Sequence, residues 1–196
     1  MNAQALAEIS EMGLRVKSME NIETKIIELI ETIIYDHFNL INIALRQKAK
    51  FEGWLKFELA SALEKNGAES VSVEYNYEGQ RADISFVHNQ DRYFIELKTS
   101  NTNWRIDGIE AKTRPITKNI NSIIMDGFKL MLCDGIGLVV FLLFPIPKND
   151  SRWRQYTDRI SKDLGIRLIE DKNYKLLNID SDSSCQILVS AVITET

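Results

Sequence analysis

Two carboxylates and one amine near the middle of the chain have the types and spacing for metal-dependent chemistry: Asp83, Glu96 and Lys98. Glu96 and Lys98 are two residues apart, so on a β-strand their side chains would share one face. Carboxylates that converge from neighbouring strands suit a hard cation such as Mg²⁺ or Mn²⁺. An ammonium group beside them can position or deprotonate a water molecule. These three residues are therefore the first candidates for a catalytic site.

The segments that carry these residues predict a β-hairpin. Residues 82–87 and 92–98 alternate in character, and the four residues between them are typical of a turn. If the hairpin is antiparallel and centred on residues 89–90, Asp83 lies across from Glu96. The same register predicts an opposite, apolar face, on which the cross-strand neighbours are Ile84 and Ile95, Phe86 and Tyr93, and Ala82 and Leu97.

The segments around the hairpin predict an α/β protein. Residues 51–67 carry leucines at helical spacing and end at Asn-Gly, and residues 71–77 alternate as a strand does. Downstream, residues 116–132 predict an amphipathic helix, and the apolar run at 137–144 is typical of a strand covered on both faces. The alternation in the first strand predicts that four side chains share a face: Val71, Val73, Tyr75 and Tyr77.

This combination resembles the PD-(D/E)xK nuclease superfamily, which has the restriction-endonuclease-like fold. The family's signature is an Asp at the start of one strand and Glu-x-Lys on the next. Asp83, Glu96 and Lys98 match it, with Ala82 in place of the family's Pro. The order helix, three strands, helix, strand is also that of the family's core, and the resemblance covers about residues 51–145. It implies an α/β fold with a central mixed β-sheet flanked by helices.

The resemblance also implies an activity, that of a metal-dependent endonuclease that hydrolyses phosphodiester bonds of DNA in restriction, repair or defence. Asp83 and Glu96 would hold Mg²⁺ or Mn²⁺, with the backbone carbonyl of Leu97 as a further ligand. Lys98 would orient the attacking water or lower its pKa, and it would offset charge at the phosphate.

In such enzymes the helix before the hairpin often supplies one more carboxylate to the metal, and two residues here are candidates. Glu52 lies three and seven residues before Leu55 and Leu59, so it shares their inward face at the helix start. Glu58 points about a quarter turn away. Glu52 is preferred for this reason, and Glu58 remains the alternative.

Candidate contacts to DNA follow the Glu-x-Lys strand. Trp104, in a polar loop, could stack on a base, and Lys118 at the start of the next helix could bind an anion. The alternative for this basic group is a solvated charged face. Asp126 and Lys129, farther along that helix, are expected to pair along its surface. The nucleic-acid-binding candidates are Trp104, Arg105, Lys112, Arg114 and Lys118.

Residues 1–50 predict a helical extension packed on the core, because apolar residues recur at helical spacing over 21–34 and continue over 38–45. Residues 51–196 would form the nuclease domain. Its C-terminal part predicts a helix over about 151–164 and then two short strands, at residues 167–170 and 186–192.

Composition places the chain among cytoplasmic globular proteins. It has 196 residues and a net charge of −4, with two widely spaced cysteines, as expected of free thiols in a reducing compartment. The longest apolar stretch is too short to span a bilayer, and no signal sequence opens the chain. The expected partners are DNA, a second copy of the chain because a duplex has two strands to cut, and a protein that recruits the enzyme.

Two other functions fit the same residues. The first is a catalytically inactive nucleic-acid-binding or assembly module of the same fold. The second is an unrelated α/β protein in which Lys98 neutralises the buried pair Asp83 and Glu96. The second function predicts that replacing Asp83 lowers stability and that no divalent cation binds. Only two histidines are present, and there is no phosphate-binding glycine loop or nucleophile elbow, so the sequence supports no competing catalytic motif.

Overall fold

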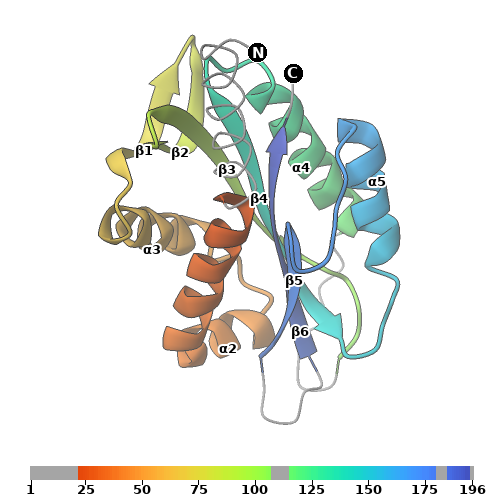
Figure 1. Cartoon of the computed structure of the whole chain (residues 1–196). Helices are drawn as coiled ribbons and strands as arrows, with labels where there is room; N and C mark the ends of the chain where they lie inside the picture. Colours follow the sequence, from red (N-terminus) through yellow and green to blue (C-terminus); the bar gives the residue numbers. More distant parts are fainter. Residues whose placement is uncertain (1–21, 107–114, 180–184, 195–196) are drawn as a thin grey trace, which may run out of the picture.

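The computed structural model describes residues 22–106, 115–179 and 185–194. Within them a six-stranded mixed β-sheet lies between two layers of helices, with a helix near the N-terminus packed on one face (Figure 1). The α/β class predicted from the sequence, with its mixed sheet and flanking helices, is therefore confirmed.

The sheet has the strand order β1-β2-β3-β4-β6-β5. Strands β3 and β4 are parallel, and the other neighbouring pairs are antiparallel. A parallel pair needs a crossover connection, which here contains helix α4. The strands are β1 Glu69–Tyr77, β2 Gln80–His88, β3 Asp91–Asn101, β4 Ile136–Pro147, β5 Tyr174–Asn178 and β6 Cys185–Thr194.

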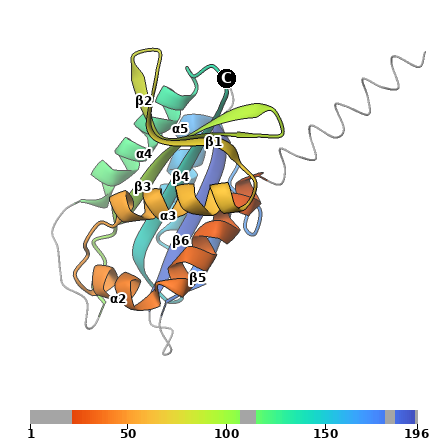
Figure 2. The same ribbon diagram turned by 90° about the vertical axis from the view of Figure 1, so that its left-hand side faces the viewer.

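Helices cover both faces of the sheet, as Figures 1 and 2 show from two sides. One face carries the helix over residues 22–36, α2 (Phe38–Arg46) and α3 (Glu52–Lys65). The other carries α4 (Ile116–Leu130) and α5 (Arg154–Leu164). Apolar residues on the two faces of β3 and β4 therefore face two separate cores, which explains their nearly continuous burial.

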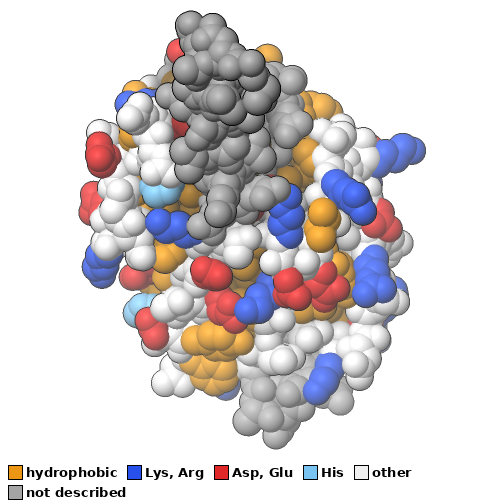
Figure 3. Space-filling view, in the orientation of Figure 1, with side chains coloured by type: hydrophobic (Ala, Val, Ile, Leu, Met, Phe, Trp, Pro, Cys, Tyr) orange, Lys and Arg blue, Asp and Glu red, His pale blue; other side chains and the backbone are white. Residues whose placement is uncertain are grey.

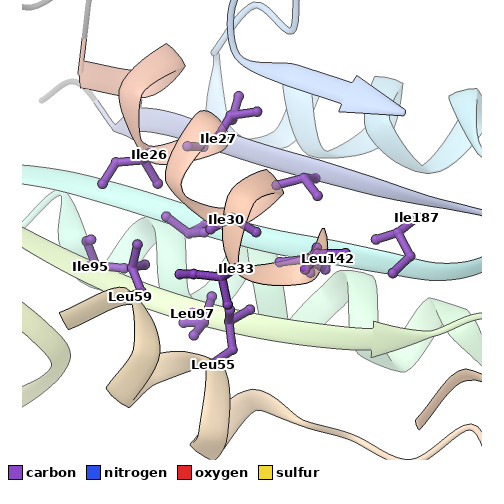
Figure 4. Packing of buried hydrophobic residues seen from close by; sticks show 14 of the residues in the cluster. Ile26, Ile27, Ile30, Ile33, Leu55, Leu59, Ile95, Leu97, Leu142 and Ile187 are labelled. Atoms are coloured by element: carbon purple, nitrogen blue, oxygen red, sulfur yellow. The ribbon is translucent and has the colours of Figure 1, made fainter. Parts of the chain in front are cut away.

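The first core joins the N-terminal helix to the sheet and to α3. Ile26 and Ile30 are fully buried against Leu55, Leu59 and the β3 residue Leu97 (Figure 4). These isoleucines are four residues apart, so they form one stripe on the helix. The helix over residues 22–36 thus shares one hydrophobic core with the sheet that carries the candidate site.

The predicted register of the central hairpin is confirmed for residues 84–88 with residues 91–95. The pairing ends at Ile84 and Ile95, so the predicted pair of Asp83 and Glu96 is not formed. Ile84 pairs with Ile95 and Phe86 with Tyr93, and the two strands are joined at Asn89-Gln90, which have φ angles of 52° and 72°. Positive φ at both central residues is the geometry of a tight two-residue turn that matches the twist of the strands.

The outer part of the β1–β2 hairpin corrects a second prediction. Val71 and Val73 pack against the first core, whereas Tyr75, Tyr77 and Ala82 pack against the second. The four β1 residues predicted to share a face therefore lie on two faces. Ala82 does not lie beside Leu97 on the face of Ile84. Glu74 has a φ of 53°, outside the strand region, so the alternation of side chains is interrupted there.

The C-terminal part corrects a third prediction, because residues 167–170 do not form a strand. Glu170 makes an isolated bridge, and the strand is β5 instead. The side-chain amide of Asn173 donates to the Arg167 carbonyl (2.9 Å) and accepts from the Ile169 N–H (2.7 Å). These backbone groups are therefore used locally rather than in a ladder. The predicted strand at 186–192 lies within β6, and the predicted helix at 151–164 contains α5.

In the part of the chain that the structure describes, no helix has the length and apolar character needed to cross a membrane.

Candidate functional site

The candidate site is built along the edge of β3 at the point where β2 leaves it. The last residue pair between the two strands is Ile84 with Ile95. Beyond it, the Leu97 N–H donates to Asp83 Oδ2 (2.9 Å) and the Thr99 N–H donates to Glu52 Oε2 (3.0 Å). Two carboxylates thus occupy the places that carbonyl groups of a neighbouring strand would take.

This backbone pairing orients both carboxylates. One oxygen of each is fixed by β3, so the other points to the side chains around it. Asp83 Oδ1 lies 3.3 Å from Lys56 Nζ, and Glu52 Oε1 lies 3.7 Å from Lys98 Nζ. Lys56 also forms an ion pair with Glu74, the residue at which β1 changes face.

Glu96 reaches the opposite side of β3 from Leu97 and is 5% exposed. Its Oε1 forms an ion pair and a hydrogen bond with Lys129 of α4. The Lys129 ammonium also donates to the backbone carbonyl of Arg81, at the start of β2. A helix on the second face of the sheet therefore neutralises a buried carboxylate on β3, as a buried charge requires.

Lys98 lies between carboxylates from two helices. Its Nζ is 3.3 Å from Asp126 Oδ2 of α4, in addition to its contact with Glu52 of α3. Asp126 Oδ2 is buried and accepts no hydrogen bond of good geometry within the described residues. Lys98, in the carboxyl-terminal half of β3, is thus held between the start of α3 and the carboxyl-terminal half of α4.

Burial, and to a smaller extent the proximity of like charges, shifts the pKa values of the carboxyl groups in the site. Burial raises the pKa of Glu96 to about 7, the hydrogen bond from Lys129 opposes the rise, and Asp83 and Asp126 add to it. Burial also raises the pKa of Asp126, although Lys98 opposes this. For Lys98 burial alone would lower the pKa, but Asp126 and the other carboxylates outweigh it and raise the pKa. A cation placed here would relieve carboxylate repulsion.

The structure brings four of the predicted site residues together: Asp83, Glu96, Lys98 and Glu52. The alternative carboxylate, Glu58, lies elsewhere on α3, with an oxygen 3.9 Å from His37 Nε2. The preference for Glu52 over Glu58 therefore agrees with the geometry of α3, because the start of this helix meets β3.

Three further residues belong to the site. Asp126 and Lys129 were expected to pair with each other, but each instead pairs with a residue of β3. Lys56 was missed by sequence reasoning. It lies four residues after Glu52, and this helical spacing could have placed it on the same face as Glu52.

The predicted DNA contacts are less well supported by their positions. Trp104 is 6% exposed, with Tyr156 and the guanidinium of Arg152 against its ring, so it offers no open face to a base. This corrects the expectation of an exposed ring, because the loop turns Trp104 into the second core. Arg105 and Lys118 are exposed.

The other two predicted contacts, Lys112 and Arg114, lie outside the described residues. On the face seen in Figure 3, acidic side chains lie among the basic ones over much of the coloured surface. The coloured part of this face therefore has no continuous basic surface that would attract a polyanion.

The donor set can be tested for a divalent metal ion. Among the described residues no three His, Cys, Asp or Glu are already grouped as ligands of one ion. The chemistry nevertheless fits, because Asp83, Glu96 and the Leu97 carbonyl offer the oxygen donors that Mg²⁺ and Mn²⁺ prefer. Asp126 Oδ2 is not counted among these donors, because it already lies 3.3 Å from Lys98 Nζ.

Comparison of the chain with protein-family models, curated proteins and solved structures finds no match. The case for a function therefore rests on the residues and on their geometry.

Proposed function

We propose that the protein is a divalent-metal-dependent endonuclease of the PD-(D/E)xK type, with a restriction-endonuclease-like core, which hydrolyses phosphodiester bonds of DNA. The observation that carries this proposal is the grouping of Asp83, Glu52 and Lys98 along the free edge of β3, with Glu96 beside them. The element order α3, β1, β2, β3, α4, β4 supports the proposal, since it is that of the family's core.

Asp83 and Glu96 would hold Mg²⁺ or Mn²⁺ together with the Leu97 carbonyl, and Glu52 would complete the set of oxygen donors. When bound, the ion would supply positive charge to the scissile phosphate and to the water that attacks it. The backbone hydrogen bonds of Asp83 and Glu52 would fix the direction of both carboxylates before the ion arrives.

Lys98 would act as a positioned cation. Its pKa is raised, so the ammonium form dominates at neutral pH and the side chain donates hydrogen bonds rather than accepting a proton. Asp126 and Glu52 hold it from two sides. This favours orientation of water and stabilisation of charge on the phosphate over general-base catalysis.

DNA, a second copy of the chain and a recruiting protein remain proposed partners, and the cytoplasm remains the proposed location. Exposed Arg105 and Lys118 are the described residues left as candidate phosphate contacts. With a net charge of −4, binding of DNA would depend on local basic groups and on the metal ion rather than on overall charge.

One observation favours a second candidate, in which the cluster is structural. Asp83, Glu96 and Asp126 each already pair with a lysine. A protein that used these residues for stability alone would have no need of a metal ion. Under this account divalent cations do not bind, and loss of Asp83 affects stability but no activity.

The test is cleavage of supercoiled plasmid and of single-stranded DNA with Mg²⁺ or Mn²⁺. The variants are Asp83→Asn and Lys98→Met, with Glu58→Gln as the matched control that removes a carboxylate outside the cluster. We expect cleavage by the wild type and the control and its loss in the two site variants. Cleavage by Asp83→Asn, or cleavage by the wild type that continues in the presence of EDTA, would contradict the proposal. DNA binding without cleavage by the wild type would indicate the inactive binding module.

A further inference from the structure

Lys129 occupies an unusual position in the candidate site. Its ammonium contacts two oxygens, Glu96 Oε1 and the carbonyl of Arg81, and 24% of its side chain is exposed. The Glu96 side chain is 6% exposed. The lysine therefore reaches from the surface of α4 to a carboxylate that has little contact with solvent.

The surroundings of Glu96 explain why it needs this partner. Asp83 and Asp126 are the other charged groups that act on Glu96, and both are negative. A buried carboxylate without a counter-charge is strongly unfavourable. Lys129 thus supplies, without a metal ion, the positive charge that a divalent cation would supply at the same oxygen.

The other two lysines of the site are placed differently. Lys98 pairs with Asp126 and Glu52, so it can stay in place when Glu96 changes its partner. Lys56 is 3.3 Å from Asp83 but also forms an ion pair with Glu74. Lys129 is the lysine whose carboxylate partner is Glu96, one of the proposed metal ligands.

We infer that Lys129 is a built-in counter-cation that competes with the divalent metal ion for Glu96. It stabilises the metal-free site, and it has to leave Glu96 Oε1 before the ion can use that oxygen. The long flexible stem of lysine allows the ammonium to swing toward solvent without movement of α4. This inference rests on the proposed function, because it takes Glu96 as a metal ligand.

Mutation of a residue in a metal site usually weakens metal binding, but the inference predicts the opposite for Lys129. Removing Lys129 removes a competitor, so Lys129→Met should bind Mn²⁺ more tightly than the wild type does. A gain of up to roughly five-fold is expected, the size that corresponds to losing one partly exposed ion pair. The same variant without metal should melt at a lower temperature, since Glu96 is left without its partner, and saturating Mn²⁺ should restore most of the difference.

The experiment is isothermal titration of Mn²⁺ at about pH 8, where a carboxyl group with a raised pKa is still ionised. Lys162→Met is the matched control, because Lys162 is an exposed lysine on α5 and its loss changes the net charge equally. Lys129→Arg keeps the charge and serves as a second variant if Lys129→Met does not fold. It should bind Mn²⁺ no more tightly than the wild type.

Tighter binding in Lys129→Met, but not in Lys162→Met, supports the inference. Binding that is unchanged or weaker in Lys129→Met, while the wild type binds Mn²⁺ and cleaves DNA, overturns the inference and leaves the proposed function standing. Absence of Mn²⁺ binding by the wild type, Lys129→Met and Lys162→Met overturns both the inference and the proposed function. If Lys129→Met is unfolded, Mn²⁺ binding by Lys129→Arg that is tighter than that of the wild type overturns the inference.

Discussion

The carboxylate of Asp83 accepts a hydrogen bond from the backbone N–H of Leu97 at 2.9 Å, just past the last residue pair between β2 and β3. Asp83 thus continues the hydrogen bonding of the hairpin with its side chain at the point where the backbones separate. Its second oxygen faces Lys56. The same residue therefore has a structural role, through Oδ2, and a proposed metal-binding role, through its charge.

Two substitutions at Asp83 should separate these roles. Asparagine retains an oxygen that can accept the Leu97 N–H, whereas alanine leaves this donor without its partner. We expect Asp83→Ala to lower the free energy of unfolding by about 1–3 kcal/mol and Asp83→Asn to lower it by less. Both should abolish metal-dependent cleavage. Urea denaturation with DNA cleavage on the same samples checks this. Equal stability of the two variants would show that the Leu97 hydrogen bond is unimportant.

Glu52 and Glu58 provide a matched pair on α3. Glu52→Ala should lower the free energy of unfolding by about 1–3 kcal/mol, since the Thr99 N–H loses its acceptor, and should reduce cleavage. Glu58→Ala should change stability by no more than about 0.5 kcal/mol, because 37% of its side chain is exposed. Thermal or urea unfolding measures both. A larger loss of stability in Glu58→Ala than in Glu52→Ala would contradict this prediction, because it would give the structural role to Glu58.

The raised pKa of Glu96 predicts a pH dependence of stability. Its pKa rises from the ordinary value of 4.5 to about 7 in the folded protein. Between these values the folded protein retains a proton that the unfolded chain has lost, so stability falls as pH rises. The loss attributable to Glu96 is complete above about pH 7 and amounts to at most about 3 kcal/mol.

The measurement is urea unfolding between about pH 4.5 and pH 8 in EDTA, for the wild type and for Glu96→Gln, which cannot titrate at this position. The free energy of unfolding of the wild type should fall relative to that of Glu96→Gln across the lower part of this range and then run parallel to it. A constant difference between the two proteins, or one of opposite sign, would show that the pKa of Glu96 is not raised.

The N-terminal helix should contribute strongly to stability. Ile30 is fully buried among residues of α3 and the sheet, whereas Ile43 of α2 is 50% exposed. Ile30→Ala should lower the free energy of unfolding by about 2–5 kcal/mol, and Ile43→Ala by no more than about 0.5 kcal/mol. Chemical denaturation compares them. A small effect of Ile30→Ala would mean that the helix over residues 22–36 packs only loosely on the sheet.

Local patterns in the sequence were sufficient for most of the central hairpin. Alternation and the polar turn predicted which residues of β2 and β3 face each other between the turn and the pair Ile84–Ile95, because a shift by one residue would have turned Ile84 and Phe86 toward the wrong layer. They did not predict that the pairing ends before Asp83. The change of face at Glu74 could not be predicted in this way, since nothing in the alternation of β1 signals a positive φ there. The misplaced strand at residues 167–170 has a similar cause, in side-chain hydrogen bonds from Asn173.

The sequence predicted the site residues that lie on the central hairpin and at the start of α3. The sequence did not predict the partners of Asp126 and Lys129, because residues three apart on a helix can also pair with each other. Which pairing forms depends on the packing of α4 against β3, which brings Lys98 and Glu96 within reach. Burial of Trp104 likewise depends on long-range packing, against Tyr156 of α5.

The most direct test of the proposed metal site is isothermal titration of Mn²⁺ into the wild type, Asp83→Asn and the control Glu58→Gln. The account predicts that the wild type and the control bind with the same affinity, and that binding by Asp83→Asn is at least about ten-fold weaker, as loss of one charged ligand implies. Equal binding by wild type and Asp83→Asn would contradict it. Absence of any binding by the wild type would also contradict it, and would instead favour a cluster of ion pairs that serves stability alone.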